Sequence, residues 1–470
     1  MKFLQSSRFI TSITSKASIL RTQTHIPSFE DRIESCLKCI FTKELNPKTF
    51  SYKLCIIFID AFLAFLFSTP IYVLTLCNIT FDADTPLIVG SFLALLSIYV
   101  YLRIPKERRF GFGFFVGVFW FYWASLSFRF VDLEMLIPFI VGVIALIYGG
   151  IFWLLLFCEC LVIRLLGLLI MHFITPFGFD WLMPEAVLAY SYFDVSYLHF
   201  ALIVCGLYCF LTPHKWRFKN LAGIFLLILA LDFGLIVPDS KETQSHTNTQ
   251  MLQHIYLSHT NVPQHLKWQD EQIATSIQEN FALIQKAIAE DKEAIVLPEI
   301  AFPMVLESGG EFGEFVISRL KQYAKDIIIV AGALRVDNGE YYNSTFVFSG
   351  DEVFFIDKVI LAPFGENIPL PDFLVRSFGV LQMFQFASGK EFSDIGIFGM
   401  RFRNAICYEA TSRKLYADYP QFVIAMSNNA WFYPSIEPFL QKMLLKFYAR
   451  KYQTTILHSG NMSQSYIITP

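Results

Sequence analysis

Long uncharged apolar stretches fill the chain from about residue 54 to 237, and mixed sequence follows. A helix needs about 20 apolar residues to cross the hydrocarbon core of a bilayer. The stretches that approach this length are predicted to span a membrane: 54–81, 86–102, 110–128, 135–158, 165–179, 197–213 and 220–237. The first contains Pro70, which could tilt or break its helix.

Beyond residue 252, short β-rich segments alternate with helical periodicity, which indicates a layered α/β domain. Strands are predicted at Ile255–Leu257, Ala294–Leu297, Ile327–Ala331, Thr345–Phe348, Val353–Ile356, Ala405–Cys407, Phe422–Met426 and Thr455–Leu457. Helices are predicted at 269–290, 311–325 and 436–452. The predicted organisation is an N-terminal cytoplasmic segment (1–53), a transmembrane helix bundle (54–237), a linker (238–252) and an α/β domain (253–470).

Composition agrees with a membrane protein. The chain is 54% hydrophobic and 16% charged, whereas soluble domains carry about 25% charged residues. Its net charge of -3 and the lack of a basic cluster argue against nucleic-acid binding.

The charges of the loops predict the orientation, because Lys and Arg stay on the cytoplasmic side. Residues 1–53 carry nine Lys or Arg against four Asp or Glu, and 103–109 and 214–219 are also basic. The loops at 82–84 and 180–196 contain acidic residues and no basic ones. This alternation predicts seven crossings, a cytoplasmic N-terminus and an extracytoplasmic α/β domain.

Two features of the predicted spans have alternative interpretations. Asp60 could be a functional carboxylate, but it lies seven residues after Lys53 and could instead reach the interface, which we favour. The run Gly111–Phe115, together with Trp120 and Trp123, could form a lipid groove. We favour close helix packing, which small residues allow.

Cysteine usage singles out one thiol. Cys407 is the lone cysteine of the second half, so it cannot close a disulfide within that half. The other cysteines lie in the first half: Cys36, Cys39, Cys55, Cys77, Cys158, Cys160, Cys205 and Cys209. Neither the Cys36–Cys39 pair nor the histidines (His246, His254, His259, His265 and His458) have metal-site spacing, so we predict no metal.

Three residues with complementary chemistry lie at the ends of predicted strands: Glu299, Lys358 and Cys407. Strand ends in α/β domains bring reactive groups together. A carboxylate can take the thiol proton, and an ammonium group can stabilise an oxyanion, so Glu299 is the candidate base and Lys358 the oxyanion partner, with the Tyr408 N–H. Taken singly, the three could be a cap, a solvated charge and a buried apolar side chain.

Several segments around these residues carry a family resemblance: 261–268, 297–303, 357–370, 406–409 and 427–432. They resemble the nitrilase (carbon–nitrogen hydrolase) superfamily, whose triad is Glu, Lys and Cys in that order. Together with the preceding spans, the chain resembles bacterial apolipoprotein N-acyltransferases. The resemblance implies a membrane bundle followed by an α-β-β-α sandwich.

The resemblance further implies acyl transfer in the bacterial inner membrane, without a cofactor. Cys407 would attack an acyl ester of a phospholipid of the phosphatidylethanolamine type and form a thioester. The α-amine of an apolipoprotein's N-terminal S-diacylglyceryl-cysteine would then take the acyl chain. It implies that Glu366 is a second essential carboxylate, and that Asn343, Tyr408, Glu409 and Trp431 line or shape the site, with packing an equal alternative for Trp431.

The chain also departs from the family pattern. Asn429 and Tyr433 stand where the family has Asp and Gly, and the segment 459–463 is altered. The family continues with more strands and an eighth membrane helix, so we expect a domain shortened at its C-terminus.

Other functions stay open: a membrane-tethered nitrilase-type amidase that uses water, or a truncated inactive member that only binds lipid or lipoprotein. A transporter is not favoured, because at most Asp60 and Glu159 are intramembrane charges.

Overall fold

The computed structural model describes residues 50–77, 85–130, 132–212, 218–236, 251–307, 310–363, 365–366 and 386–470. The chain divides into two compact units, Met1–Ile59 and Asp60–Pro470, and the packing described below is that of the second unit. The predicted segment 1–53 and the predicted linker 238–252 lie mostly outside the described residues.

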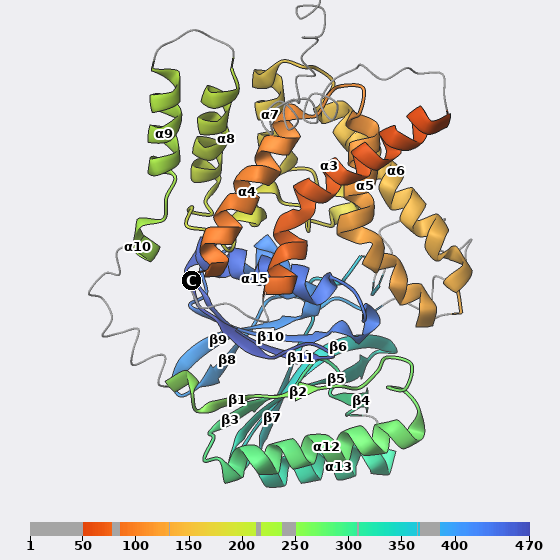
Figure 1. The fold of residues 1–470 in the computed structure, drawn as a ribbon. Helices are drawn as coiled ribbons and strands as arrows, with labels where there is room; N and C mark the ends of the chain where they lie inside the picture. The colour runs from red at the N-terminus through yellow and green to blue at the C-terminus, as the bar shows by residue number, and fades with distance from the viewer. Residues whose placement is uncertain are drawn as a thin grey trace, which may run out of the picture. The chain divides into compact units, whose positions relative to one another are not determined.

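The first half is built from apolar helices (Figure 1). They are α3 (Phe50–Cys77), α4 (Thr85–Arg103), α5 (Arg109–Phe121), α6 (Ile137–Leu155), α7 (Leu161–Met171), α8 (Tyr197–Leu211), α9 (Lys219–Leu229) and α10 (Phe233–Ile236). The 3-10 helix η1 (Tyr122–Phe130) extends α5. Helix α3 contains Pro70 without a break, so Pro70 does not split the first span.

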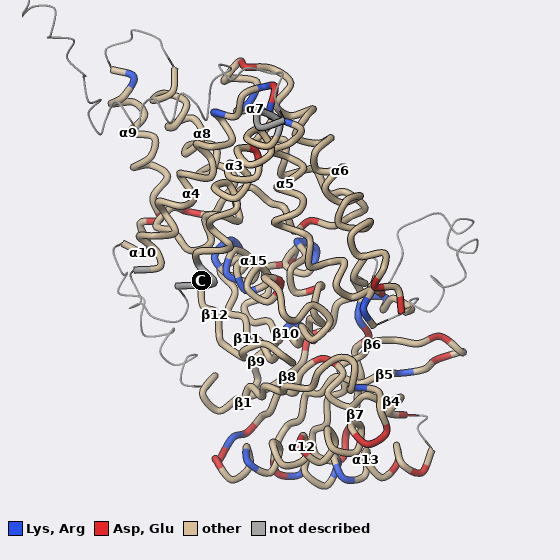
Figure 2. Tube along the Cα trace, turned by 45° about the vertical axis from the view of Figure 1, so that its right-hand side comes forward, with Lys and Arg blue, Asp and Glu red and all other residues tan. Residues whose placement is uncertain are grey.

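Five described segments are long and apolar enough to cross a membrane: Leu54–Val73, Pro86–Arg103, Arg109–Phe130, Glu134–Leu155 and Leu161–Gly178. Helices α8 and α9 are apolar but shorter, so the count of seven spans stays a prediction. The fifth predicted span, 165–179, corresponds to Leu161–Gly178, in which the α-helix α7 ends at Met171. Figure 2 shows these helices mostly free of charged residues along their length.

The intramembrane features resolve into helix packing. Asp60 is buried within the protein, and its Oδ1 accepts a hydrogen bond at 3.1 Å from Nη1 of Arg108, which belongs to the basic segment 103–109. Its position at the membrane interface stays a prediction. A Cβ on Gly111 would lie 2.2 Å from Asp60 Oδ2, so any other residue there would displace this carboxylate. Buried Trp120 donates to Ser68 Oγ at 2.9 Å. These contacts support packing for Gly111 and Trp120, whereas Trp123 lines an apolar cavity described below.

The second half contains two sheets. The first has the order β1 (Ile255–Leu257), β3 (Ala294–Val296), β5 (Ile328–Asp337), β6 (Glu340–Ser349), β7 (Glu352–Asp357), and β4 (Phe302–Val305) pairs with β5. The second has the order β12 (Tyr466–Ile468), β11 (Thr455–Asn461), β10 (Phe422–Asn428), β9 (Met400–Ile406), β8 (Asp394–Ile397), and β2 (His259–Thr260) pairs with β11. Strands β1, β3 and β5 are parallel, as are β9, β10 and β11.

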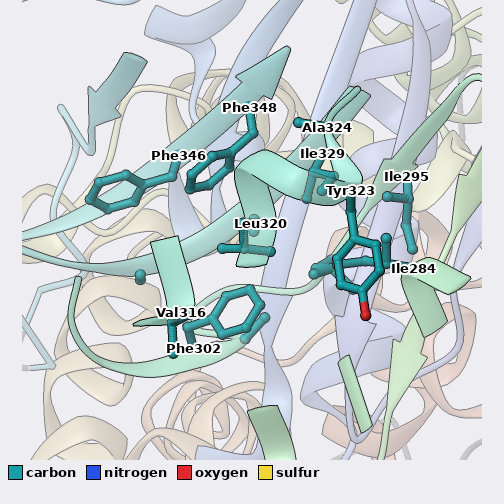
Figure 3. Close-up of a cluster of buried hydrophobic side chains, with 14 of the residues drawn as sticks. Ile284, Ile295, Phe302, Val316, Leu320, Tyr323, Ala324, Ile329, Phe346 and Phe348 are labelled. Carbon is teal, nitrogen blue, oxygen red and sulfur yellow. The ribbon is translucent and has the colours of Figure 1, made fainter. Parts of the chain in front are cut away.

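Successive side chains of a strand point to opposite faces of its sheet, so strands β3, β5 and β6 of the first sheet contribute to two separate layers of the core. In β5, Ile329 and Ala331 point into a core shared with the helices, whereas Val330 joins the core between the sheets. Helices α12 (Asp270–Ala289) and α13 (Gly310–Tyr323) cover the outer face of the first sheet (Figure 1), and Figure 3 shows the buried cluster beneath them. Helix α15 (Glu437–Tyr452) covers the second sheet, which completes the predicted α-β-β-α order.

All eight predicted strands and all three predicted helices of this half have counterparts in the structure. The prediction missed β2, β4, β8 and β12. It also placed Cys407 inside a strand, whereas β9 ends at Ile406 and Cys407 has a φ of 54°. This left-handed conformation cannot continue a strand, so the thiol lies on the turn that follows.

A buried arginine of α15 joins the two halves. Arg450 is 4% exposed, and among the described residues its guanidinium donates to segments of the helical half. Its Nη1 donates to the carbonyl oxygens of Leu188, Ala189 and Ser191 at 2.9, 3.1 and 2.9 Å, and its Nη2 donates to the Phe193 oxygen at 2.7 Å and to Asp232 Oδ2 at 2.8 Å. These bonds fix α15 against the helical half.

Candidate active site

The three candidate residues converge at the ends of strands from both sheets. Glu299 follows β3, Lys358 follows β7, and Cys407 follows β9. Lys358 Nζ lies 3.8 Å from Glu299 Oε1, and both side chains are buried. Cys407 is half-buried and not in a disulfide. The charges of Glu299 and Lys358 both influence the pKa of this thiol, so the three groups form one electrostatic cluster.

Two amide donors orient Glu299. Asn343 Nδ2 donates to Oε1 at 2.8 Å, and the Asn428 backbone N–H donates to Oε2 at 2.7 Å. The backbone bends sharply here, since Ile300 has a φ of 47°, which is rare for a β-branched residue. A Cβ on Gly332 of β5 would lie 2.4 Å from the Ile300 nitrogen, so glycine allows this close approach.

Lys358 is held between two carboxylates. Its Nζ lies 2.6 Å from Glu366 Oε2, and Asn343 Nδ2 also donates to Glu366 Oε1 at 2.9 Å. Burial lowers the pKa of Lys358, but the charges of Glu366 and Glu299 outweigh it and hold this pKa above its ordinary value. Lys358 is therefore an ammonium group, suited to stabilising negative charge rather than to accepting a proton.

The Cys407 thiol is neutral in the resting site. Burial, followed by the charge of Glu299, raises its pKa well above the ordinary value, although Lys358 acts in the opposite direction. A nucleophilic attack by this sulfur would require a base, and Glu299 is the carboxylate whose charge acts most strongly on the thiol.

Glu409 ties the nucleophile turn to the lysine turn. Its Oε2 accepts the Ile406 N–H at 2.9 Å, and its Oε1 accepts the N–H groups of Val359 and Ile360 at 2.8 and 3.0 Å. Burial raises the pKa of Glu409 to about 7, although these N–H donors oppose the shift. One carboxyl group thus holds both the residue before Cys407 and the two residues after Lys358.

Tyr408 and Trp431 contact the helical half. The Tyr408 ring stacks on Phe179 with centroids 5.5 Å apart, and its hydroxyl donates to Asp180 Oδ1 at 3.1 Å. Trp431 packs its ring edge-on against Phe130 at 5.6 Å. Phe432, not Trp431, is among the described residues that line the cavity beside Cys407, which favours packing for Trp431.

An apolar cavity of about 410 Å³ opens beside the thiol. Cys407, Tyr408 and Phe432 form part of its wall. Aromatic and aliphatic residues from α5, η1 and α6 and from 176–181 form most of the rest, among them Phe121, Trp123, Phe139, Ile140, Val143, Ile144, Tyr148 and Trp181. A hydrocarbon chain would be shielded from water here while its end lies at the sulfur.

The sequence did not identify two buried groups near the cluster. Lys267 Nζ donates to the Glu299 carbonyl oxygen at 3.3 Å, and burial lowers its pKa to about 8. Glu437, the first residue of α15, lines the cavity, and its Oε2 accepts a hydrogen bond from Asn429 Nδ2 at 2.8 Å. The one signal in the sequence was that Asn429, the partner of Glu437, stands where the family has Asp.

Comparisons with solved structures give partial similarities. A mutant of an amidase from the nitrilase superfamily, from Nesterenkonia AN1, is 16% identical, with a TM-score of 0.35 over 46% of this chain and 82% of that chain. A CN-hydrolase superfamily protein from Xanthomonas campestris is 15% identical, with a TM-score of 0.33 over 44% of this chain and 75% of that chain.

Sequence comparisons are more extensive. A family model described as the apolipoprotein N-acyltransferase integral membrane domain matches residues 54–233. The apolipoprotein N-acyltransferase of Wolinella succinogenes is 43% identical over 418 residues, which cover 88% of this chain and 95% of that protein. The Helicobacter hepaticus enzyme is 44% identical over 400 residues, which cover 83% and 95%. With such identity over nearly the full length of these relatives, the chain belongs to the apolipoprotein N-acyltransferase family of membrane acyltransferases.

Proposed function

We propose that this chain moves an acyl group from a membrane phospholipid to the N-terminal S-diacylglyceryl-cysteine of an apolipoprotein, through a thioester on Cys407. The observation that carries the proposal is the location of the thiol. It lies in the wall of an apolar cavity formed largely by the helical half, next to the buried pair of Glu299 and Lys358. A lipid ester needs both an apolar site for its chain and polar groups at its carbonyl.

In the first half-reaction, Glu299 takes the proton of Cys407 Sγ while the sulfur attacks the ester carbonyl carbon. The Lys358 ammonium stabilises the negative charge that develops on the carbonyl oxygen. The C–S bond forms, the ester C–O bond breaks, and Glu299 returns the proton to the leaving oxygen. The products are a lysophospholipid and an acyl-enzyme.

In the second half-reaction, the α-amine of the acceptor attacks the thioester carbonyl carbon. The C–N bond forms and the C–S bond breaks, while Glu299 takes a proton from the amine and passes it to the departing sulfur. Lys358 again stabilises the oxyanion. The product is an amide, and Cys407 returns to its thiol form.

The proposed location is the bacterial inner membrane, with the domain 253–470 on the periplasmic side. The support is the charge of the loops, since 1–53, 103–109 and 214–219 are basic whereas 82–84 and 180–196 are not. Both substrates are lipids of that leaflet, so a catalytic domain joined to membrane helices meets them by lateral diffusion.

The test is direct detection of the acyl-enzyme. The purified full chain is incubated with phosphatidylethanolamine and analysed by intact-mass spectrometry, with Cys407→Ala as the matched control. We expect one hydroxylamine-labile acyl adduct in the wild type and none in the variant. No adduct in the wild type, or the same adduct in the variant, would refute the thioester.

Addition of a diacylated lipopeptide then tests the acceptor. The adduct should disappear as the peptide gains one acyl chain. If water removes the acyl group equally fast with and without peptide, the chain is a hydrolase of the amidase type instead.

A further inference from the structure

Glu437 is a buried carboxyl group that the mechanism above does not use. It is 1% exposed, yet it lines the same cavity as Cys407. Its Oε2 accepts from Asn429 Nδ2 at 2.8 Å. Among the residues that the structure describes, none donates a hydrogen bond to its Oε1 and none forms an ion pair with it. This oxygen is not among the fully buried unpartnered atoms of the described residues, so it is open to the cavity, where a ligand could bind it.

The neighbouring residues hold this group in a fixed orientation. Asn429 Nδ2 donates to Glu437 and also to Gln441 Oε1 at 3.1 Å, while Asn429 Oδ1 accepts from Ser463 Oγ at 2.7 Å. The amide thus has a partner on each side, which defines which end carries the nitrogen. Because both N–H groups of Asn429 are used, Glu437 is restrained at Oε2, and Oε1 remains available to a ligand.

The electrostatic surroundings favour a group that brings N–H donors. Burial, together with the charge of Glu299, raises the pKa of Glu437 to about 8, although the hydrogen bond from Asn429 opposes the shift. The Glu437 charge in turn raises the pKa of Cys407. A cationic or N–H-rich ligand at this position would relieve the repulsion between these acidic groups.

We propose that Glu437 binds the amino group of the acyl acceptor and orients it toward the thioester. This inference rests on the proposed function and names the acceptor subsite of that same cavity. An amine that attacks the carbonyl bonded to Cys407 must enter the cavity whose wall contains both Cys407 and Glu437. One amine N–H donates to Glu437 Oε1, the lone pair attacks the carbonyl carbon, and the proton lost from nitrogen goes to Glu299 and then to sulfur.

A primary amine could also come from the donor, as the ethanolamine of its head group. That nitrogen is separated from the reacting carbonyl by the phosphate and the glycerol, whereas the acceptor nitrogen bonds to the carbonyl carbon itself. The position of Glu437 beside the thiol therefore favours the acceptor.

The test separates the two half-reactions in the full chain with Glu437→Gln. Acyl-enzyme formation from phosphatidylethanolamine should change by a smaller factor than transfer does; some change is expected because Glu437 also influences the pKa of the Cys407 thiol. Transfer from the isolated acyl-enzyme to a diacylated lipopeptide should need up to about tenfold more peptide for half-maximal rate, because the glutamine can turn an NH₂ group rather than an oxygen toward the amine and one hydrogen bond is then lost. Wild-type concentration dependence of transfer would overturn the proposal.

Two further arms separate acceptor binding from a packing effect and from a role in donor binding. Gln441→Met removes the other acceptor of the Asn429 amide, and Gln441 is not among the described residues that line the cavity. An equal loss of transfer in this variant would assign the effect to packing and overturn the proposal. A slower first step with phosphatidylethanolamine but not with phosphatidylglycerol would assign Glu437 to the donor head group and overturn the proposal. Failure of acyl-enzyme formation in the wild type would instead contradict the proposed function itself.

Discussion

Replacing Glu409 by Gln changes one oxygen of the carboxyl group that joins the nucleophile turn to the lysine turn. In the wild type, Oε1 accepts from Val359 and Ile360, and Oε2 accepts from Ile406. A glutamine oxygen can keep the first two bonds, but its NH₂ group then faces the Ile406 N–H. Two donors would meet at the residue before Cys407, and the turn must shift or leave an N–H unsatisfied.

The size of the effect follows from that single lost acceptor. A buried donor without a partner costs about 1–3 kcal/mol. If the cost falls on the geometry of the transition state, it lowers the rate about 5-fold to 150-fold, at about 1.4 kcal/mol per factor of ten. If the turn absorbs it before the reaction, the same free energy appears as lost stability.

Two measurements distinguish these outcomes: the rate of acyl-enzyme formation and the midpoint of thermal unfolding in detergent. Glu271→Gln is the matched control, because it replaces the same type of side chain at an exposed position in the first turn of α12. We expect Glu409→Gln to lose rate, stability or both, and the control to lose neither. A Glu409→Gln variant equal to the wild type in both would refute the view that this carboxyl group positions Cys407.

Three other predictions follow from buried contacts. Arg450→Met removes the bonds to the helical half and leaves Asp232 without this partner, so the free energy of unfolding should fall by about 3–5 kcal/mol; an unchanged denaturation midpoint would contradict this. Gly332→Ala places a Cβ 2.4 Å from the Ile300 nitrogen and should slow acyl-enzyme formation by displacing Glu299, which single-turnover kinetics would detect. The pKa of Glu437 is about 8 in the folded chain against an ordinary 4.5, so the folded state holds this proton more tightly than the unfolded chain does. Wild-type stability should therefore decline relative to Glu437→Gln as the pH rises from about 5 to 8, by a few kcal/mol in denaturant titrations; parallel pH profiles would disprove the shift.

The sequence predicted the strands whose both faces are buried. Strand β5 and strand β6 contain continuous apolar runs around Val330 and Val347, because one face packs on the helices and the other on the second sheet. The missed β8 (Asp394–Ile397) is a short edge strand with alternate residues exposed, and its glycine and aspartate are not typical of strands. Edge strands owe their existence to a partner strand that sequence patterns do not reveal.

The site shows a similar division. Glu299, Lys358 and Cys407 could be predicted because each lies at a strand end, where topology alone brings them together. Glu437 could not, because an acidic residue in the first turn of a helix is ordinarily a solvated charge that favours the helix dipole. Its burial depends on how α15 packs against the rest of the unit, and the pairing of Asp60 with Arg108 depends likewise on tertiary contacts.

The acceptors of Arg450 have a consequence for how this protein can change over generations. Four of its five bonds end on main-chain oxygens, which every amino acid possesses, so these bonds depend on the path of the backbone at 188–193 and not on which side chains it carries. The arginine has no such freedom, because a lysine presents a single ammonium group and cannot reach the same set of carbonyls. A saturation mutagenesis screen should therefore tolerate almost no replacement at position 450, whereas tolerance along 188–193 should follow the burial of each side chain and be greater at Tyr190 and Tyr192 than at Leu188 and Ala189.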